Sequence, residues 1–306
     1  MAVIGYPSQN LTLAKQGIRD NRTCMLNDKH PNDMIKQARE LCRQNIRDLF
    51  KIVEWNIAHD IRMYRISSDI APQLSNWRAL PESKKMDWRE LTYDLWEFEA
   101  DIVRVAELAK IHDHRLTFHP PPFVVLNAKN PFILTAVKRE LWWHTLFFEI
   151  GKFPKKSTLT IHTGGIYGDK LSAIERFIKN YSGLDQRIKS RLILENDEDA
   201  FNIDDVIGIS ERCGIPVCFD YFHFLCYNKN RQKNPKKYFR QRALSAVIKF
   251  LRANRSDQTK LHYSEQAPGM RLGTHSNYIK NIPSWMFEFD LMVESKCKEL
   301  SLRMKY

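Results

Sequence analysis

Short apolar runs alternate along the chain with longer segments of helical periodicity. In the clearest run, Leu192, Ile193 and Leu194 are followed at once by Glu195, a pattern typical of a buried strand of a parallel sheet whose carboxyl end opens to solvent. The pattern recurs, so we predict further strands at 2–6, 61–66, 116–118, 158–161, 217–219 and 260–264. An eighth strand, or a passage from strand to helix, is predicted at 286–294.

Helices are predicted between these strands, where apolar residues recur at intervals of three or four. They cover about 31–53, 91–108, 131–150, 170–178, 203–213 and 238–251, and a last amphipathic helix closes the chain. Asn202 and Gly214 are suited to begin and to end the helix 203–213. Residues 73–85 are predicted to form a loop or an insertion.

The alternation of eight strands with helices predicts an α/β fold of the TIM (β/α)8 barrel type, with residues 1–306 as a single domain. An open doubly wound sheet is the competing architecture. No Gly-x-Gly-x-x-Gly and no Walker loop follows a strand to support it. In a barrel the carboxyl ends of all strands meet on one face, so side chains that follow the strands should converge.

Many acidic, imidazole and amine side chains follow the predicted strands. Packing alone would not account for so many polar residues at these positions. On the barrel hypothesis they lie at strand ends or in the loops that follow them: His119, His162, Glu195, Asp220, His223, Lys260, His262, His275 and Glu294. Imidazoles and carboxylates without thiolates are the ligands of hydrolytic Zn²⁺ or Mn²⁺ sites, and this set is large enough for two or three ions.

Closely spaced metal ions stabilise both the attacking and the leaving oxygen in phosphodiester cleavage. The strand-end ligands therefore favour a hydrolase that acts on a phosphodiester. Glu195 is predicted to bridge a pair of ions, with Asn196 and Asp197 orienting the loop and the ligands around it.

The charge of the chain favours a polyanionic partner. Lys+Arg number 48 against 36 Asp+Glu, which gives a net charge of +12 and a pI near 9.4, so nucleic acid is the first candidate. A basic segment from Lys229 to Arg242, which includes Arg231 and Lys233, follows the sixth strand on the same face as the candidate ligands. This segment either contacts DNA or is a solvated helix surface.

Cysteine usage and the absence of long apolar segments bear on the compartment. The six cysteines are scattered without Cys-x-x-Cys spacing, which favours a reduced, intracellular protein. Cys218 falls inside a predicted strand, where we expect a small core residue. We predict no signal peptide and no transmembrane segment, and we expect a monomer without a membrane partner.

A series of short motifs spans almost the whole chain: Gly5-Tyr6-Pro7, Asn10-Leu11-Thr12, Asn21-Arg22-Thr23, Tyr64-Arg65-Ile66-Ser67-Ser68, Leu116-Thr117-Phe118-His119-Pro120, His162-Thr163-Gly164-Gly165, Tyr167-Gly168-Asp169-Lys170, Leu194-Glu195-Asn196-Asp197, Pro216-Val217, Phe219-Asp220, His223, Lys260 and His262-Tyr263-Ser264. Together they resemble the UV damage endonucleases, relatives of endonuclease IV in the xylose-isomerase-like barrel superfamily.

The resemblance implies a manganese-dependent enzyme, with Zn²⁺ or Mg²⁺ as the other candidate ions. Such an enzyme nicks double-stranded DNA immediately 5′ of ultraviolet lesions, cyclobutane pyrimidine dimers and 6-4 photoproducts, and leaves a 3′-hydroxyl and a 5′-phosphate that begin excision repair. The implied metal shell consists of His119, His162, Glu195, Asp220, His223, His262, His275 and Glu294.

The resemblance also implies catalytic roles for Glu195, Lys260 and Tyr6. Lys260 resembles a lysine that can be carboxylated, which would turn a cation into a further carboxylate beside the metals. Such a carboxylate would offset Gly273, which stands where endonuclease IV has an Asp. Tyr6 and Asn10 resemble residues that touch the scissile phosphate or the DNA near it.

The loop after His119 departs from the family pattern. The family has Gly-Gln and then an aromatic, and the Gln and aromatic side chains enter the duplex while the damaged bases flip out; here the residues are Pro121, Pro122 and Phe123. Phe123 can still act as an apolar wedge, whereas Pro122 lacks the amide that would fill the vacated space. The loop either recognises lesions through these residues or simply tolerates proline.

Three other functions fit parts of the pattern. The first is an endonuclease IV-like nuclease that cuts at abasic sites. The second is a metal-dependent sugar isomerase or epimerase on the same barrel, against which the basic charge and the size of the ligand set argue. The third is a DNA-binding relative that keeps the metal shell and has lost cleavage.

Overall fold

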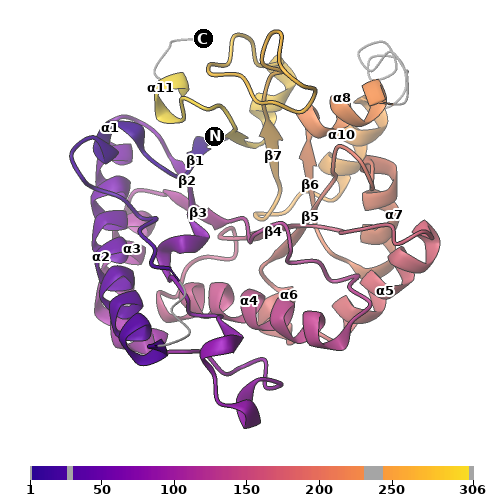
Figure 1. Ribbon diagram of the computed structural model, residues 1–306. Coiled ribbons are helices and arrows are strands. Elements are labelled where there is room, and N and C mark those ends of the chain that lie inside the picture. Colours follow the sequence, from indigo (N-terminus) through magenta and orange to yellow (C-terminus); the bar gives the residue numbers. More distant parts are fainter. Residues whose placement is uncertain (1, 26–29, 231–243, 303–306) are drawn as a thin grey trace.

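Eight parallel strands in sequence order close into a barrel (Figure 1). The computed structural model describes residues 2–25, 30–230 and 244–302. The strands are β1 (Ile4–Pro7), β2 (Met63–Ile66), β3 (Arg115–Phe118), β4 (Leu159–His162), β5 (Leu192–Glu195), β6 (Val217–Asp220), β7 (Lys260–Tyr263) and β8 (Asp290–Val293). The fold is therefore the TIM (β/α)8 barrel that the alternation predicted.

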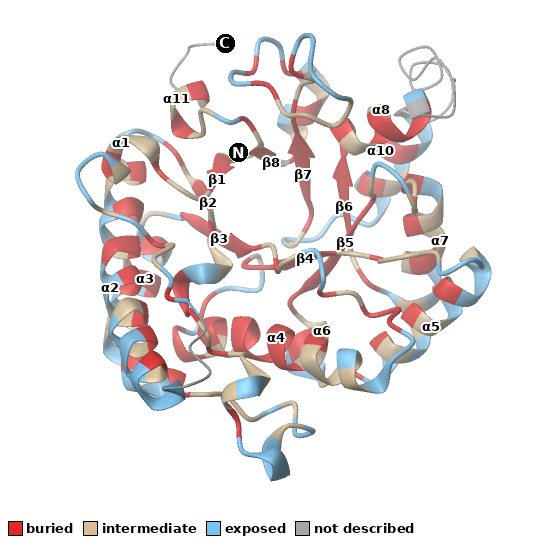
Figure 2. Ribbon diagram, in the orientation of Figure 1, coloured by how far each residue is buried: buried red, intermediate tan, exposed pale blue. Residues whose placement is uncertain are grey.

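Helices surround the barrel and bury one face against it (Figure 2). They are α1 (Leu11–Ala14), α2 (Pro31–Ala58), α3 (Glu99–Ile111), α4 (Pro131–Ile150), α5 (Lys170–Ser182), α6 (Gln186–Lys189), α7 (Ile203–Cys213), α8 (Tyr221–Asn230), α10 (Leu244–Ala253) and α11 (Glu299–Leu302). Short 3-10 turns occupy Ser68–Ile70, Trp77–Ala79, Glu82–Lys84, Leu95–Phe98 and Ser284–Glu288. Within the described ranges, none of the helices combines the length and the apolar character that crossing a membrane requires.

An aromatic cluster packs α4 against the barrel wall. The ring of Phe118, from β3, lies 5.9 Å from Trp143, 5.5 Å from Phe147 and 5.2 Å from Phe148, measured between ring centroids. All four side chains are buried, and aromatic pairs at these separations stabilise beyond the area they bury. This packing fixes β3, the strand that leads directly into His119.

The register of the strands decides which side chains point into the barrel. Residues paired across parallel strands share one face of the sheet, and one row of pairs runs His162, Glu195, Cys218, Lys260 and Asp290. Because barrel strands tilt, the row descends from the carboxyl end of β4 to the first residue of β8. It therefore places Cys218 and Lys260 inside the barrel, below Glu195.

The predicted ends of the helix 203–213 are confirmed. Asn202 caps α7 by accepting a hydrogen bond from the Asp205 backbone N–H, while the Asp205 carboxylate accepts one from the Asn202 N–H. Gly214 ends the helix with a φ of 75°, a left-handed conformation that glycine adopts without strain.

Two predicted elements are shorter than expected, and a third is described only in part. The helix expected over 91–108 begins only at Glu99, because Asp94 caps a 3-10 turn at Leu95–Phe98 instead. The strand expected over 286–294 is reduced to β8, since a 3-10 turn follows Pro283. The helix expected over 238–251 is observed from Leu244 as α10, and its earlier part lies outside the described residues.

Candidate metal centre

The strand ends supply most of the predicted ligands. Each of β4, β5 and β6 ends on one, respectively His162, Glu195 and Asp220, because an apolar strand interior gives way to polar residues where the barrel opens. The other ligands follow a strand or lie in its last residues: His119 after β3, His223 in the first turn of α8, His262 in β7 and Glu294 after β8.

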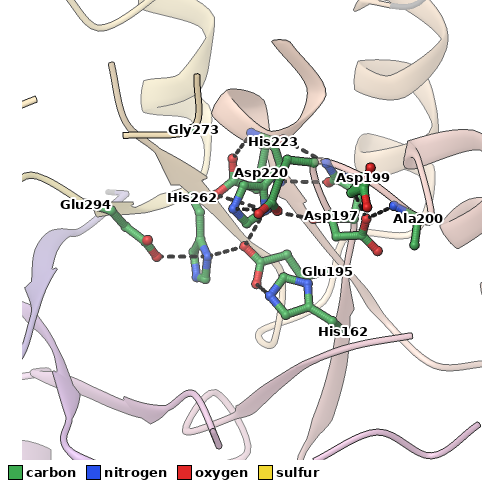
Figure 3. A network of polar contacts seen from close by, with 12 residues as sticks. His162, Glu195, Asp197, Asp199, Ala200, Asp220, His223, His262, Gly273 and Glu294 are labelled. Atoms are coloured by element: carbon green, nitrogen blue, oxygen red, sulfur yellow. Dashed lines mark hydrogen bonds and ion pairs between the residues drawn. The ribbon is translucent and has the colours of Figure 1, made fainter. Parts of the chain in front are cut away.

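Glu195 is the centre of the cluster. Its Oε2 lies 2.9 Å from His119 Nε2 and 3.6 Å from His162 Nε2, while its Oε1 lies 2.6 Å from His262 Nδ1 (Figure 3). The carboxylate is almost fully buried. One carboxyl group therefore faces three imidazoles, which lie after β3, at the end of β4 and within β7.

A second set of contacts joins Glu195 to the other two acids. His262 Nδ1 lies 3.2 Å from Glu294 Oε1, and His223 Nδ1 lies 3.8 Å from Asp220 Oδ2 and 3.9 Å from Glu195 Oε1 (Figure 3). The chain thus brings three carboxylates and four imidazoles into one continuous network at the mouth of the barrel.

The network contains several triads that have the spacing of metal ligands. In each triad the possible ligand atoms lie within 4.8 Å of one another: His119, His162 and Glu195; Glu195, Asp220 and His223; Asp220, His262 and Glu294. Glu195 and Asp220 each belong to two of them, so neighbouring ions can share a carboxylate.

The chemistry of the donors fits divalent ions. His162 Nδ1 and His262 Nε2 are buried and have no hydrogen-bond partner, whereas buried polar atoms are normally paired. Oxygen and imidazole donors suit Zn²⁺ and Mn²⁺. The seven residues of the network can therefore hold more than one such ion.

The histidines control the ionisation of the central acid. Burial raises the pKa of Glu195, but the nearby His262 and His162 and hydrogen bonds from His119 and His262 outweigh it and hold that pKa well below its usual value. Burial lowers the pKa of His223, yet Asp220 and Glu195 raise it to about 10. Opposite charges thus stabilise one another in a site largely closed to solvent.

Asn196 and Asp197 orient the loop after β5, as predicted. The Asn196 amide donates to the Asp220 carbonyl at 2.9 Å and accepts from the Asp220 N–H at 2.9 Å, and the Asn196 carbonyl lies 2.9 Å from His223 Nδ1. Asp197 accepts from the backbone N–H of Asp199 at 2.9 Å and of Phe201 at 3.0 Å. These contacts position two of the candidate ligands through the backbone.

Lys260 and His275 occupy less central places than expected. Lys260 is the first residue of β7, one pleat below His262, so its expected position at a strand end is wrong. Its amine is fully buried without a hydrogen-bond partner, and burial lowers its pKa to about 8. His275 belongs to none of the triads; its Nδ1 lies 2.9 Å from the Glu294 carbonyl oxygen.

Tyr6 and Asn10 are buried behind the barrel wall. Gly5 pairs with Met63 and Met292 in the inward-facing set, so Tyr6 points outward, and its hydroxyl donates to Asn56 of α2 at 2.7 Å. Asn10 donates to the Tyr6 hydroxyl at 2.8 Å and caps α1 through its side-chain oxygen. In this arrangement neither side chain reaches the surface.

Apart from Tyr6 and Asn10, the predicted DNA-contacting residues that the structure describes are exposed. Phe123 keeps 67% of its surface accessible, and Pro122 and Lys229 are also exposed. Phe123 lies in the loop that follows the carboxyl end of β3, and Lys229 lies in the last turn of α8, the helix that follows β6. Arg231 and Lys233 lie outside the described residues.

Sequence reasoning missed two residues of the cluster. The Nη1 atom of Arg65 lies 2.6 Å from Glu294 Oε1, and the signal was present, because Arg65 is a charged residue two positions beyond the inward-facing Met63 in a strand. Cys218 is fully buried, as predicted for a core residue, but its sulfur also lies within 4.8 Å of ligand atoms of Glu195 and His262. No local pattern distinguishes it from a packing residue.

Comparisons with known proteins point to one family. A family model described as UV-endonuclease UvdE matches residues 2–305. A UV DNA damage endonuclease of Clostridium perfringens is 33% identical over 306 residues, which cover 97% of this chain and 68% of that protein. A UV-damage endonuclease of Schizosaccharomyces pombe is 28% identical over 97% of this chain and 49% of its own length. The crystal structure of SacUVDE matches with a TM-score of 0.80 at 27% identity, over 98% of this chain and 95% of that one.

Proposed function

The chain belongs to the UV-endonuclease UvdE family, and on this premise we propose that it is a metal-dependent endonuclease that nicks duplex DNA on the 5′ side of ultraviolet photoproducts. We propose Mn²⁺ as the physiological ion and a 3′-hydroxyl and a 5′-phosphate as the products. The proposal includes a single catalytic unit formed by the whole barrel.

The observation that carries the proposal is the position of Glu195. Its two carboxylate oxygens face different imidazoles, with Oε2 at 2.9 Å from His119 and Oε1 at 2.6 Å from His262. A carboxylate shared in this way suits a bridge between ions. When bound, divalent ions supply Lewis-acid activation of the phosphate and of the attacking water.

Different residues of the network would then hold different ions. His119 and His162 would hold one ion with Glu195, and His223 with Asp220 would hold a second. Asp220, His262 and Glu294 would hold a third. His275, whose ring contacts the backbone of Glu294, would join the shell from the loop after β7.

Lys260, which lies below the ligands in the barrel, would be carboxylated. Its buried amine has no hydrogen-bond partner, and burial lowers its pKa to about 8, so a neutral amine that can accept carbon dioxide is accessible near neutral pH. Carboxylation would add a negative charge beneath the ligands, which would offset the absence of an acidic side chain at Gly273.

The exposed groups on the carboxyl face would hold the duplex. Phe123 would act as the wedge beside the damaged bases, next to Pro122, and Lys229 would contact backbone phosphates together with Arg231 and Lys233. Tyr6 and Asn10 would approach the scissile phosphate only if the β1 end moved on DNA binding. Without that movement they support the site by positioning α1 and β1.

The proposal is tested by incubating the purified protein with supercoiled plasmid and Mn²⁺. The plasmid is used unirradiated, irradiated, or carrying abasic sites. We expect relaxation of the irradiated plasmid, no cleavage of the unirradiated control, and loss of activity with a chelator. Cleavage restricted to abasic sites would replace the proposed lesion by an endonuclease IV-like specificity, and an intact plasmid in every arm would contradict nuclease function.

A further inference from the structure

Cys218 is a buried residue that lies beside two of the candidate ligands, Glu195 and His262. Its register partners are Glu195 on β5 and Lys260 on β7, so its side chain points into the barrel with theirs. The sulfur is fully buried, and Cys218 forms no disulfide. A cysteine that served only to pack would be expected among apolar side chains, whereas this one is flanked by an acid and an amine.

The sulfur has the distances of a metal ligand. Ligand atoms of Glu195, Cys218 and His262 all lie within 4.8 Å of one another, and all three residues are buried. A tetrahedral ion holds sulfur at about 2.3 Å and imidazole nitrogen at about 2.0 Å. The three donor atoms therefore lie close enough together to be candidates for ligands of one ion.

Two unpaired polar atoms provide independent support for a ligand at this place. His262 Nε2 and Lys260 Nζ are both buried without a hydrogen-bond partner, and both residues are fully buried in the same part of the barrel. Buried polar atoms without partners are rare and costly. An ion beside Cys218 would supply the missing partner for the imidazole nitrogen.

We propose that Cys218 is a thiolate ligand at the base of the metal centre, where it shares one ion position with Glu195 and His262 and strengthens the binding of thiophilic divalent ions such as Zn²⁺ and Co²⁺ at that position. The proposal rests on the metal centre of the proposed function and adds a sulfur donor to it. When the ion binds, the Cys218 thiol gives its proton to solvent and a metal–sulfur bond forms. Thiolate ligands favour Zn²⁺ over Mn²⁺, which prefers oxygen donors.

Cobalt substitution tests the proposal directly. The metal-free protein is titrated with Co²⁺, and the near-ultraviolet absorption is followed for a thiolate-to-cobalt charge-transfer band. We expect this band in the wild-type protein and in Cys226→Ala, which removes a buried cysteine of α8 that lies in no ligand triad. Cys218→Val should abolish the band and keep the visible cobalt bands of the histidine ligands, which show that the variant is folded and still binds the ion.

The affinity for Zn²⁺ gives a second measure. Cys218→Val should raise the dissociation constant for Zn²⁺ by at least about 10-fold, the lower end of what even an outer-shell partner contributes to a metal site. The affinity for Mn²⁺ should change far less. A wild-type protein without the charge-transfer band, or a band that persists in Cys218→Val, would overturn the thiolate ligand.

The same preparations are assayed for nicking of irradiated plasmid with Mn²⁺. This assay distinguishes a failure of the sulfur-ligand proposal from a failure of the endonuclease proposal. Nicking without a charge-transfer band leaves the endonuclease standing and removes Cys218 from the ligand set. A charge-transfer band without nicking establishes the sulfur ligand and contradicts the endonuclease function.

Discussion

The guanidinium of Arg65 lies 2.6 Å from the carboxylate of Glu294, Nη1 to Oε1, and this ion pair joins the end of β2 to the end of β8. Only 16% of the Arg65 side chain and 12% of the Glu294 side chain are exposed, so water screens the pair less than it screens a surface ion pair. Burial raises the pKa of Glu294, but Arg65 and His262 outweigh it and hold that pKa well below its usual value. Arg65 thus keeps Glu294 ionised and oriented toward His262.

Arg65→Met should weaken metal binding, because Glu294 would lose the donor that orients it. Loss of such a partner typically costs a metal site about 10-fold to 100-fold in affinity, and calorimetric titration with Mn²⁺ measures the change. Arg62→Met is the matched control, since Arg62 precedes β2 at the opposite end of the barrel and pairs with Asp60. An unchanged dissociation constant in Arg65→Met would rule out the positioning role.

Phe123→Ala should reduce nicking of lesion-containing DNA without loss of stability. Stacking of a base on an aromatic side chain contributes about 1–3 kcal/mol, so we expect a loss of roughly 10-fold to 100-fold in kcat/KM. Because 67% of Phe123 is exposed, the free energy of unfolding should change by less than about 0.5 kcal/mol.

The control for Phe123 is Ile111→Ala, which removes another exposed apolar side chain, at the end of α3. This variant should cleave at the wild-type rate. Equal rates for Phe123→Ala and the wild-type protein would show that the proline-rich loop takes no part in lesion recognition.

Asp20 should make the stability of the metal-free protein fall as the pH rises from about 4 to about 6. Burial raises the pKa of this carboxyl from 3.8 to about 6, against the hydrogen bonds from Ser67 and Tyr64. In that window the unfolded chain releases the proton and the folded protein retains it. The free energy of unfolding therefore falls by on the order of 2–3 kcal/mol, and the fall is complete once the pH exceeds the pKa of the folded state.

Asp20→Asn cannot ionise, and its side-chain oxygen can still accept the hydrogen bonds from the Tyr64 hydroxyl, at 2.9 Å, and the Ser67 N–H, at 3.2 Å. Its stability relative to the wild-type protein should therefore increase across the window, as measured by urea unfolding at several pH values. If the free energies of unfolding of the two proteins changed in parallel with pH, the raised pKa of Asp20 in the folded state would be contradicted.

The sequence was sufficient for the barrel and for most of the candidate ligands because both depend on local order. An apolar run that ends in Glu195 or Asp220 indicates a buried strand, and the acid marks the carboxyl end of that strand. In a barrel all such ends meet, so the convergence of His119, His162 and Glu195 follows from the strand count.

The residues that sequence reasoning misplaced depend on register, which no local pattern reveals. Tyr6 faces α2 because Gly5 occupies the inward position, where an added Cβ would lie 2.0 Å from the Met63 carbonyl oxygen. Lys260 and Cys218 lie below the mouth because the tilt of the strands carries their row into the barrel. The short α3 and β8 differ for another reason, since Asp94 and Pro283 begin 3-10 turns inside segments whose apolar spacing resembles a longer helix and a longer strand.

The central claim is that Glu195 joins the ions that cleave DNA beside an ultraviolet lesion. Its most direct test is a duplex with one defined cyclobutane pyrimidine dimer, incubated with Mn²⁺ and the wild-type protein, Glu195→Gln or Glu175→Gln. Glu175 is the matched control, since it pairs with Arg212 on the surface of α5.

We expect the wild-type protein and Glu175→Gln to make a single nick immediately 5′ of the dimer, with a 3′-hydroxyl that a polymerase can extend. Glu195→Gln should bind the same duplex but cleave it at least roughly 100-fold more slowly. The loss of a bridging carboxylate should reduce the rate by more than the loss of an outer-shell partner does. A duplex left intact by the wild-type protein with Mn²⁺, or cut equally fast by Glu195→Gln, would contradict the claim.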